Sequence, residues 1–588
     1  MTILKDLTDE WTELANGRMR WETYWRNVAA WVLPQTEQYD RVVSLGAQSS
    51  VQAVMGAPAA SERSKYIYDM TSIWAIDRLT AGLISLKTPE SDYWHDLSVD
   101  DDYGYEQTHD EDVALEKLRD YLFKVRSNPK SGFWPNHKAS VKSMCAFGDG
   151  WHFIEELQGG RIPYQYQNIP LFECYPSVNA AGQPDRMFRV FSWSALQIYQ
   201  KWGEKAGPKI KTMVDDPKRM HERVRILHAV RPRGDEYRNK LGLRGAKFAS
   251  WYCLPDDDHV IGEGGFWEFP FTRYAWSNIG QRPYSEGPVA YAIAEIMSLQ
   301  EMSKNELIAV QTMLRPAYGT FGKNFTRLNF NPGATNPGLI NGDGNPLFAP
   351  LNSGVRPDFA QSVIESRRNN VREALYLNLW QILVQDNMSQ PETATEAMLR
   401  AQEKGEMLGP VGISMNEGLS QNIDREVSIL ARKGAFAAGS PLAMPESMAD
   451  QEVSPQFTSP LDRLRQVGQL VGAQRMVEFA ALLVANGMDP AIAGRIDGDE
   501  LLELAQRVLG APVKSLRDRD VSKQGRQQQA QMADTATAIQ GAQGTGDAMR
   551  ALGEGAQAAA GGAEALRGSP AIASLMQQIG QSQTRTAA

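Results

Sequence analysis

Apolar residues recur every three or four positions across residues 287–316, which is the spacing of one helix face. Gly287-Pro288 opens this stretch, and proline suits a first helical turn because its missing N–H would be unpaired there. Pro316 closes it. The pattern predicts a helix about 40 Å long. Its apolar stripe consists of Val289, Ile293, Ile296, Leu299, Leu307, Ile308 and Leu314.

An irregular stretch and a second helix are expected next. Residues 317–357 are rich in Gly, Pro and Asn and show almost no periodicity, whereas residues 358–384 return to helical spacing. Asp358 is the expected N-cap, because an Asp side chain there accepts a hydrogen bond from an early N–H. The apolar stripe of this helix consists of Ile364, Val371, Leu375, Leu379 and Ile382.

A short polar loop over residues 385–392 then leads to a third helix. Thr393-Ala394-Thr395-Glu396 has the form of a capping box, which satisfies unpaired N–H groups at a helix start. The helical pattern continues to Leu430, and Pro410 within it predicts a kink.

The N-terminal region is also predicted to be helical. Trp11, Trp21 and Trp25 share one helical face that ends before Pro34. This aromatic face packs either on the protein's own core or on a neighbouring subunit. The other expectations for this region are helices over residues 71–86 and 113–125 and loops over residues 35–65 and 92–112.

Acidic residues cluster at 100–102, 109–112 and 256–258. A calcium loop needs alternating oxygen ligands around a glycine and a closing Glu, and this spacing is absent from all three. We therefore expect solvated loops and no metal site at these positions.

The middle third of the chain favours strands. Residues 151–154 and 162–166 flank Gly159-Gly160 as in a hairpin. The Gly and Pro content predicts an α+β region of short strands rather than one large parallel sheet. The further strands are expected over residues 187–193, 223–230, 249–254 and 266–274.

The C-terminal part returns to helical patterns. Helices are expected over residues 460–486 and 500–509, the second capped by Asp499. Residues 521–588 contain no Phe, Trp or Tyr and are dominated by Ala, Gln and Gly. This composition is typical either of disorder or of a long Ala-rich helix that needs copies of itself for stability.

Composition limits the possible classes of function. The chain has 588 residues, of which 42% are hydrophobic, so it can bury substantial cores in about three or four domains. A net charge of −9 argues against a protein that grips nucleic acid electrostatically. Three scattered cysteines fit a reducing compartment. Neither a signal peptide nor a membrane-spanning run is expected.

Motifs for catalysis or cofactor binding are missing from the sequence. It lacks the Gly-x-x-x-x-Gly-Lys-Ser/Thr phosphate loop, which disfavours a motor ATPase. It also lacks His-Glu-x-x-His, Cys-x-x-Cys and Gly-x-Ser-x-Gly. Residues 262–265 and 342–344 are Gly-rich without the strand-then-helix context of a nucleotide site, so turns are expected there. We predict no catalytic residue, no metal and no cofactor.

The order of several stretches resembles the portal, or head-to-tail connector, proteins of short-tailed bacteriophages, over about residues 4–509. No single stretch is diagnostic, and their order and spacing carry the resemblance. They are Arg20-Trp21-Glu22-Thr23-Tyr24-Trp25, Ala81-Gly82-Leu83 with Pro89 and Trp94, Ser143-Met144-Cys145-Ala146-Phe147-Gly148-Asp149-Gly150, Gly287-Pro288 with Leu299-Gln300-Glu301, and Thr393-Ala394-Thr395-Glu396.

The resemblance implies an α+β, predominantly helical, portal-type fold assembled as a dodecameric ring. Its parts would be a wing over residues 1–286, stem helices over 287–316 and 358–384 with a clip over 317–357 between them, a tunnel loop over 385–392, the wing spine helix and linker over 393–458, a helical crown over 459–512, and a tail over 513–588 that is a helical barrel or disordered.

The resemblance also implies a function without enzymatic activity. Such a ring nucleates procapsid assembly, docks the terminase for packaging, connects head to tail and passes DNA during ejection. Its partners would be double-stranded DNA, the terminase large subunit, the major capsid and scaffolding proteins and a tail adaptor, with no membrane. It would lie at the capsid vertex of the virion, after assembly in the host cytoplasm. The alternative is a structural tail or scaffold component that conducts no DNA.

Two sets of contact residues follow from this resemblance. The tunnel loop offers polar side chains with little charge toward DNA: Gln385, Asp386, Asn387, Ser389 and Gln390. The expected clip residues for docking the motor and later the tail are Lys323, Asn324, Arg327, Asn341 and Asp343.

The arginines of the second helix have two interpretations. Arg368 and Arg372 share a helix face with Gln361 and Glu365. Either they form a salt-bridged, solvated surface with Glu365, or they contact the DNA backbone or a neighbouring stem helix.

Overall fold

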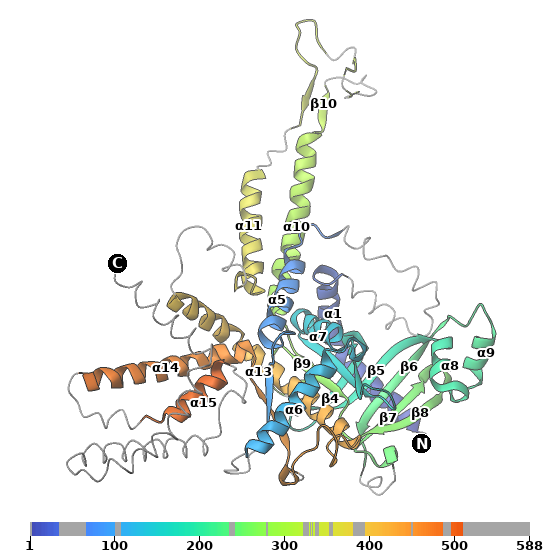
Figure 1. Cartoon of the computed structure of the whole chain (residues 1–588). Helices are drawn as coiled ribbons and strands as arrows, with labels where there is room; N and C mark the ends of the chain where they lie inside the picture. Colours follow the sequence, from blue (N-terminus) through green and yellow to red (C-terminus); the bar gives the residue numbers. More distant parts are fainter. Residues whose placement is uncertain are drawn as a thin grey trace, which may run out of the picture. The chain divides into compact units, whose positions relative to one another are not determined.

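Helices and antiparallel strands alternate along the chain in a computed structural model (Figure 1). It describes residues 3–34, 66–99, 108–234, 242–277, 280, 282–320, 329, 331, 333–335, 340–351, 357–379, 394–448, 451–485 and 496–509. The loop expected over residues 35–65, the tunnel loop, the C-terminal tail and nearly half of the residues expected in the clip lie outside these ranges.

The longer helices are α1 (Ile3–Trp31), α5 (Thr71–Lys87), α6 (His109–Arg126), α7 (Phe133–Phe147), α8 (Ala195–Trp202), α9 (Pro208–Asp215), α10 (Pro288–Leu314), α11 (Pro357–Ala374), α13 (Ala394–Arg432), α14 (Pro460–Ala485) and α15 (Gly498–Leu509).

The strands are β1 (His95–Val99), β2 (Asp149–Glu156), β3 (Tyr164–Ile169), β4 (Cys174–Val178), β5 (Pro184–Ser194), β6 (Arg223–Pro232), β7 (Phe248–Leu254), β8 (His259–Phe266), β9 (Phe271–Ala275), β10 (Tyr318–Thr320), β11 (Phe348–Pro350) and β12 (Val453–Phe457). They pair in the orders β4-β5-β6-β7-β8, β3-β2-β9, β1-β12 and β10-β11. All of these pairings are antiparallel, as the short-strand prediction requires.

The five-stranded sheet is covered on both faces, by α1 on one side and by α8 on the other. Successive strand residues point to opposite sides, so neighbouring residues reach different helices. Val190 of β5 packs with Leu7 of α1, while the next residue, Phe191, packs with Ile198 of α8. The strands therefore contribute to one apolar cluster on each side of the sheet. They also contribute Met187, Val230 and Phe248 to the main core, which is formed mainly by α1, α5, α6, α7, α10, α13 and the three-stranded sheet.

The aromatic face of α1 packs on the protein's own core. Trp25 is fully buried and meets Phe172 and Tyr284 edge-on, with ring centroids 6.1 and 4.9 Å apart. Trp11 meets Tyr175 of β4 edge-on at 6.2 Å. The first of the two interpretations of this face accounts for these tryptophans.

Several stretches expected to be irregular are regular. Residues 95–99, inside the loop expected over residues 92–112, form strand β1 and pair with β12. Residues 109–112 form the first turn of α6 rather than a solvated loop, and the N–H of Thr108 donates to Glu111 Oε2 at 2.9 Å in a capping box. Residues 262–265 pair with β7 as part of β8 rather than forming a turn. A Cβ at Gly265 would lie 2.2 Å from Leu243 O, so close backbone contact requires glycine in this strand.

Three helix ends differ from their predictions. Helix α11 starts at Pro357, so Asp358 lies inside its first turn. The same helix ends at Ala374, ten residues before the predicted end, because the chain turns there and Tyr376 adopts φ 58°. Helix α15 starts at Gly498, and Asp497 rather than Asp499 accepts from the N–H of Glu500, at 3.4 Å.

Candidate functional site

Helices α10 and α11 lie side by side, and α11 holds Arg368 and Arg372, the predicted DNA-contact residues that the structure describes (Figure 1). Arg367 of α11 joins them through Nη1, which lies 2.6 Å from Glu295 Oε2. One face of the first half of α10 is buried, including Val289 and Leu299. In the second half of α10 the apolar stripe is exposed to solvent: Leu307 is 48% and Leu314 is 78% exposed.

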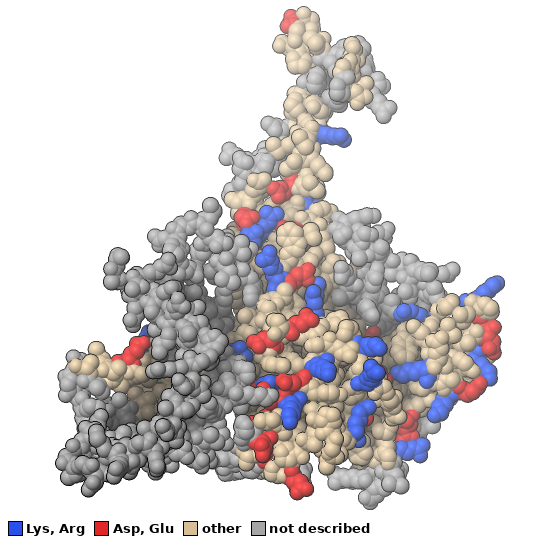
Figure 2. All heavy atoms as spheres, in the orientation of Figure 1, with Lys and Arg blue, Asp and Glu red and all other residues tan. Residues whose placement is uncertain are grey.

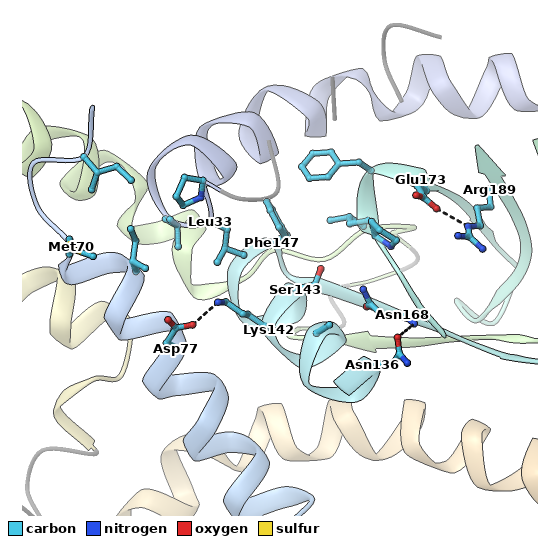
Figure 3. Close-up of a pocket in the computed structure, with 18 residues that line it drawn as sticks. Leu33, Met70, Asp77, Asn136, Lys142, Ser143, Phe147, Asn168, Glu173 and Arg189 are labelled. Carbon is cyan, nitrogen blue, oxygen red and sulfur yellow. Dashed lines mark hydrogen bonds and ion pairs between the residues drawn. The ribbon is translucent and has the colours of Figure 1, made fainter. Parts of the chain in front are cut away.

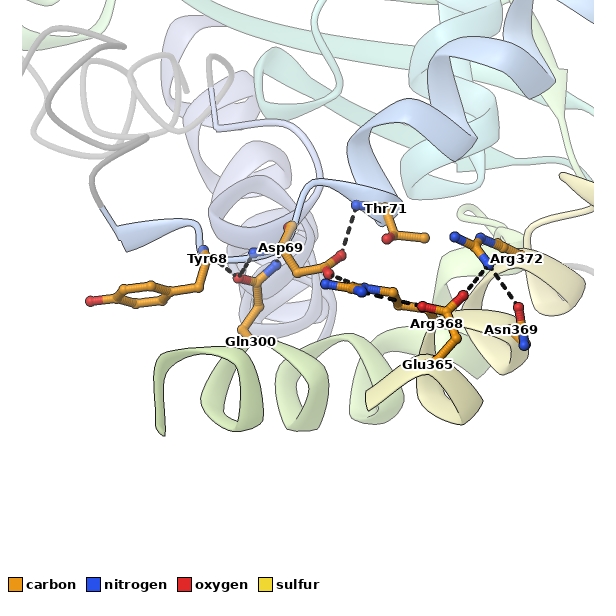
Figure 4. Close-up of polar contacts among 8 residues, drawn as sticks. All are labelled: Tyr68, Asp69, Thr71, Gln300, Glu365, Arg368, Asn369 and Arg372. Atoms are coloured by element: carbon orange, nitrogen blue, oxygen red, sulfur yellow. Dashed lines mark hydrogen bonds and ion pairs between the residues drawn. The ribbon is translucent and has the colours of Figure 1, made fainter. Parts of the chain in front are cut away.

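Asp69, just before α5, brings both helices to one polar cluster (Figure 4). The Gln300 side chain of α10 accepts from the N–H groups of Tyr68 and Asp69 at 2.8 and 3.0 Å, and donates to the Asp69 carbonyl at 2.6 Å. The Asp69 carboxylate accepts from the Thr71 N–H at 2.8 Å. Its other oxygen accepts from Arg368 Nε of α11, also at 2.8 Å. A single dipeptide thus binds α10 and α11 together.

Glu365 extends this cluster along α11. Its carboxylate accepts from Arg368 Nη1 at 3.2 Å and from Arg372 Nη1 at 2.7 Å. Arg372 also donates to Asn369 Oδ1 at 2.7 Å. Both arginines are therefore paired within the chain, as the salt-bridged interpretation expects. Their contact with DNA stays a prediction.

The charges of the cluster are stabilised by their neighbours. Burial favours the neutral form of Asp69, but hydrogen bonds from Thr71 and Arg368 outweigh it and hold the pKa of Asp69 below its usual value. Hydrogen bonds from Arg372 and Arg368 lower the pKa of Glu365. The cluster is therefore ionised at neutral pH, with two positive and two negative groups.

The expected clip residues are only partly described. Asn341 Oδ1 accepts from the N–H groups of Asp343 and Asn345 at 3.0 and 2.9 Å, which closes a turn at residues 341–344, as predicted there. Strands β10 and β11 pair in a short hairpin stem, so this stretch is not wholly irregular. Lys323, Asn324 and Arg327 lie outside the described residues, as do Gln385, Asp386, Asn387, Ser389 and Gln390.

Two of the quoted stretches meet in the core. A Cβ added to Gly148 would lie 2.2 Å from Ser285 O and 2.7 Å from Gly287 N. Asp149 accepts from the Ser285 N–H at 2.6 Å and from Arg273 Nε at 2.6 Å. The start of α10 is thus fixed against the end of α7, and these motif residues have a structural role.

A cavity of about 670 Å³ lies between the end of α1, the start of α5 and α7 (Figure 3). Two ion pairs stand in its wall, Lys142–Asp77 at 2.6 Å and Arg189–Glu173 at 2.8 Å. The wall charges are therefore balanced, and the cavity favours neither an anion nor a cation. Its apolar wall includes Leu33, Met70 and Phe147.

The described surface carries charges of both signs. In the view of Figure 2, the described Lys and Arg side chains are interspersed with Asp and Glu. Among the described residues no group of three or more His, Cys, Asp or Glu could hold a metal ion. None of the described helices is long and apolar enough to cross a membrane.

Sequence reasoning found the arginines and their partner Glu365, but it missed Asp69, which pairs with Arg368, and Gln300, which holds Asp69. Gln300 stands in a quoted stretch, yet its role needed the fold, and Asp69 carried no local signal. Asp69 and Arg368 are 299 positions apart.

Comparison with known proteins agrees with the resemblance to head-to-tail connector and portal proteins. The family model described as "Bacteriophage head to tail connecting protein" matches residues 4–516. A "Probable portal protein" of Bordetella phage BPP-1 is 22% identical over 527 residues, covering 87% of this chain and 88% of that protein.

Two solved structures also match. They are a virion of a native gene transfer agent particle, with 10% identity and a TM-score of 0.32, and the neck of an empty particle of the same kind, with 13% identity and a TM-score of 0.30. Each alignment covers 80% of this chain and 98% of the matched chain. The family model, which spans most of the sequence, decides the assignment: this chain belongs to the bacteriophage head-to-tail connecting protein family.

Proposed function

We propose that this chain is the portal protein of a short-tailed phage and that its copies form a ring, dodecameric in the resembled family, at one capsid vertex. The observation that carries the proposal is the family match over residues 4–516, which includes α10, α11 and α13. The "Probable portal protein" of Bordetella phage BPP-1 supports it over 87% of this chain and 88% of that protein.

The uncovered end of α10 supports oligomerisation. Leu307, Ile308 and Leu314 project into solvent from a single chain, and such apolar surface usually marks a contact between proteins. In the proposed ring this part of α10 packs against neighbouring copies. Helices α10 and α11 form the stem, and the channel is lined by α11 and by residues 385–392.

In this role the protein is structural and has no catalytic function. It nucleates procapsid assembly, docks the terminase large subunit through residues 317–357, and later joins the tail adaptor there. DNA moves through the ring during packaging and ejection. A fixed positive wall would hold the DNA through counterion release, so a polar loop of low charge suits this passage.

Negative-stain images of the purified full-length chain test the proposal. We expect rings with a central hole wide enough for a DNA duplex. Filaments or monomers would favour the alternative of a tail or scaffold component that conducts no DNA.

Deletion of residues 386–390 tests the channel assignment separately. We expect intact rings that package or retain less DNA. Normal packaging by the deletion variant would show that the loop has no role in DNA passage.

A further inference from the structure

The two arginines of α11 are electrically neutralised inside their own chain (Figure 4). Arg368 lies between Asp69 and Glu365, and Arg372 shares Glu365. Their side chains are 34% and 29% exposed, so the guanidinium groups are near the surface but already occupied.

Asp69 is a fixed counter-charge rather than a mobile one. It is 4% exposed, and Gln300 holds its backbone through the N–H and the carbonyl. The Thr71 N–H orients one carboxylate oxygen, which leaves the other directed at Arg368. Because these contacts already order Asp69, little further conformational entropy is lost when it pairs with the arginine.

We propose that Asp69 and Glu365 prevent Arg368 and Arg372 from gripping DNA phosphates as the duplex passes. This inference rests on the proposed function, in which α11 lines the channel. An unpaired guanidinium in every subunit would surround the duplex with positive charge. Each phosphate it neutralised would release counterions and strengthen binding, which slows movement. Asp69 then affects DNA binding without touching the DNA, because it acts through Arg368.

The test compares DNA binding by assembled rings of the full-length protein and of Asp69→Asn. Asparagine keeps an oxygen for the Thr71 N–H and places an uncharged NH2 group, which cannot accept a hydrogen bond, where the second oxygen faced Arg368. The probe is a short fluorescein-labelled DNA duplex, and anisotropy is read across a salt series. We expect Asp69→Asn to bind more tightly than the unmodified protein. This gain in affinity should shrink about 3.5-fold for each added phosphate contact when the salt rises from about 50 to 200 mM. The reason is that log K falls with log salt concentration with a slope of about −0.9 per contact.

Two further variants exclude a merely structural effect. Asp69→Asn combined with Arg368→Gln should return binding to that of the unmodified protein, because the released charge is gone. Glu365→Gln should also increase binding through Arg372, and its 47% exposed side chain is not needed for the core.

Asp77→Asn is the matched control on α5. It frees Lys142 of α7 from a 2.6 Å ion pair without touching α11, so we expect no gain. The inference is overturned if Asp77→Asn increases DNA binding as much as Asp69→Asn does. It is also overturned if intact rings of Asp69→Asn, or intact rings of Glu365→Gln, bind DNA no more tightly than the unmodified protein. Images without rings would instead overturn the proposed function, and the inference with it.

Discussion

Arg126 of α6 and Glu426 of α13 form an ion pair inside the core, with Nη2 and Oε2 2.7 Å apart and side chains 1% and 0% exposed. The Tyr166 hydroxyl of β3 donates to the same carboxylate at 2.5 Å. Burial raises the pKa of Glu426, while Arg126 and the Tyr166 hydroxyl favour its charged form. Through this one carboxylate, α13 is joined to the helical and the strand parts of the main core.

Replacing Glu426 by Gln should strongly destabilise the protein. The substitution leaves the Arg126 charge buried without its counter-charge, which costs about 3–5 kcal/mol of unfolding free energy. Urea unfolding followed by tryptophan fluorescence measures this loss. Glu365→Gln is the control, since it breaks ion pairs at the surface and should cost at most about 1 kcal/mol. Equal losses of unfolding free energy in the two variants would show that the buried ion pair stabilises the protein no more than the surface pairs do.

Gly148 should tolerate no side chain. Alanine there would combine a left-handed backbone (φ 105°) with a Cβ 2.2 Å from Ser285 O, so the start of α10 must shift. We expect Gly148→Ala to cost about 2–5 kcal/mol. Gly160→Ala has a similar φ of 100° but open space, and it should cost only about 1–2 kcal/mol. Matching melting temperatures for the two variants would contradict the close packing of α7 on α10.

The sequence predicts those features that depend on neighbours along the chain. Gly287-Pro288 placed the start of α10 correctly, and the three-residue spacing of Glu365 and Arg368 predicted their salt bridge. Most strands of the five-stranded sheet were found from their composition and spacing. Strand β8 was missed because it is rich in glycine; Gly265 is required there by a close contact with Leu243, and no local pattern reveals such a contact.

Other features depend on residues far apart in the sequence. The periodicity of α10 marks an apolar stripe but cannot tell which half the chain itself covers. The Asp69–Arg368 pair spans 299 positions, and α11 ends where Tyr376 adopts a positive φ that an apolar stripe does not announce. These features required the fold.

His152 should make the protein sensitive to acid. Burial lowers its pKa to about 4, while an unfolded histidine titrates near about 6.5. A lowered folded-state pKa stabilises the protein above the unfolded value, and this contribution is lost as the pH falls from about 6.5 toward 4. At about pH 5 the loss from this one residue is about 2 kcal/mol.

His152→Phe isolates this contribution and keeps an aromatic ring in the core. Urea unfolding of both proteins between about pH 7 and pH 5 should give a shallower pH dependence for the variant, by about 2 kcal/mol. His95, His137 and His228 are also buried with lowered pKa values, so both proteins will still lose stability in acid. Parallel curves would show that His152 is not neutral in the folded state.

The uncovered end of α10 allows assembly to be separated from folding. Leu307 and Leu314 are seven positions apart on nearly the same side of the helix and are exposed in the single chain. The double change Leu307→Glu and Leu314→Glu should therefore cost the isolated chain little. In a subunit contact the same carboxylates would be buried without partners, at a cost of several kcal/mol each.

Mass photometry should show rings lost in favour of smaller species, with an unchanged far-ultraviolet circular dichroism spectrum. Asn305→Asp, a charge on the opposite side of the helix, should leave the rings intact, and rings of normal abundance in the double variant would place the subunit contact elsewhere.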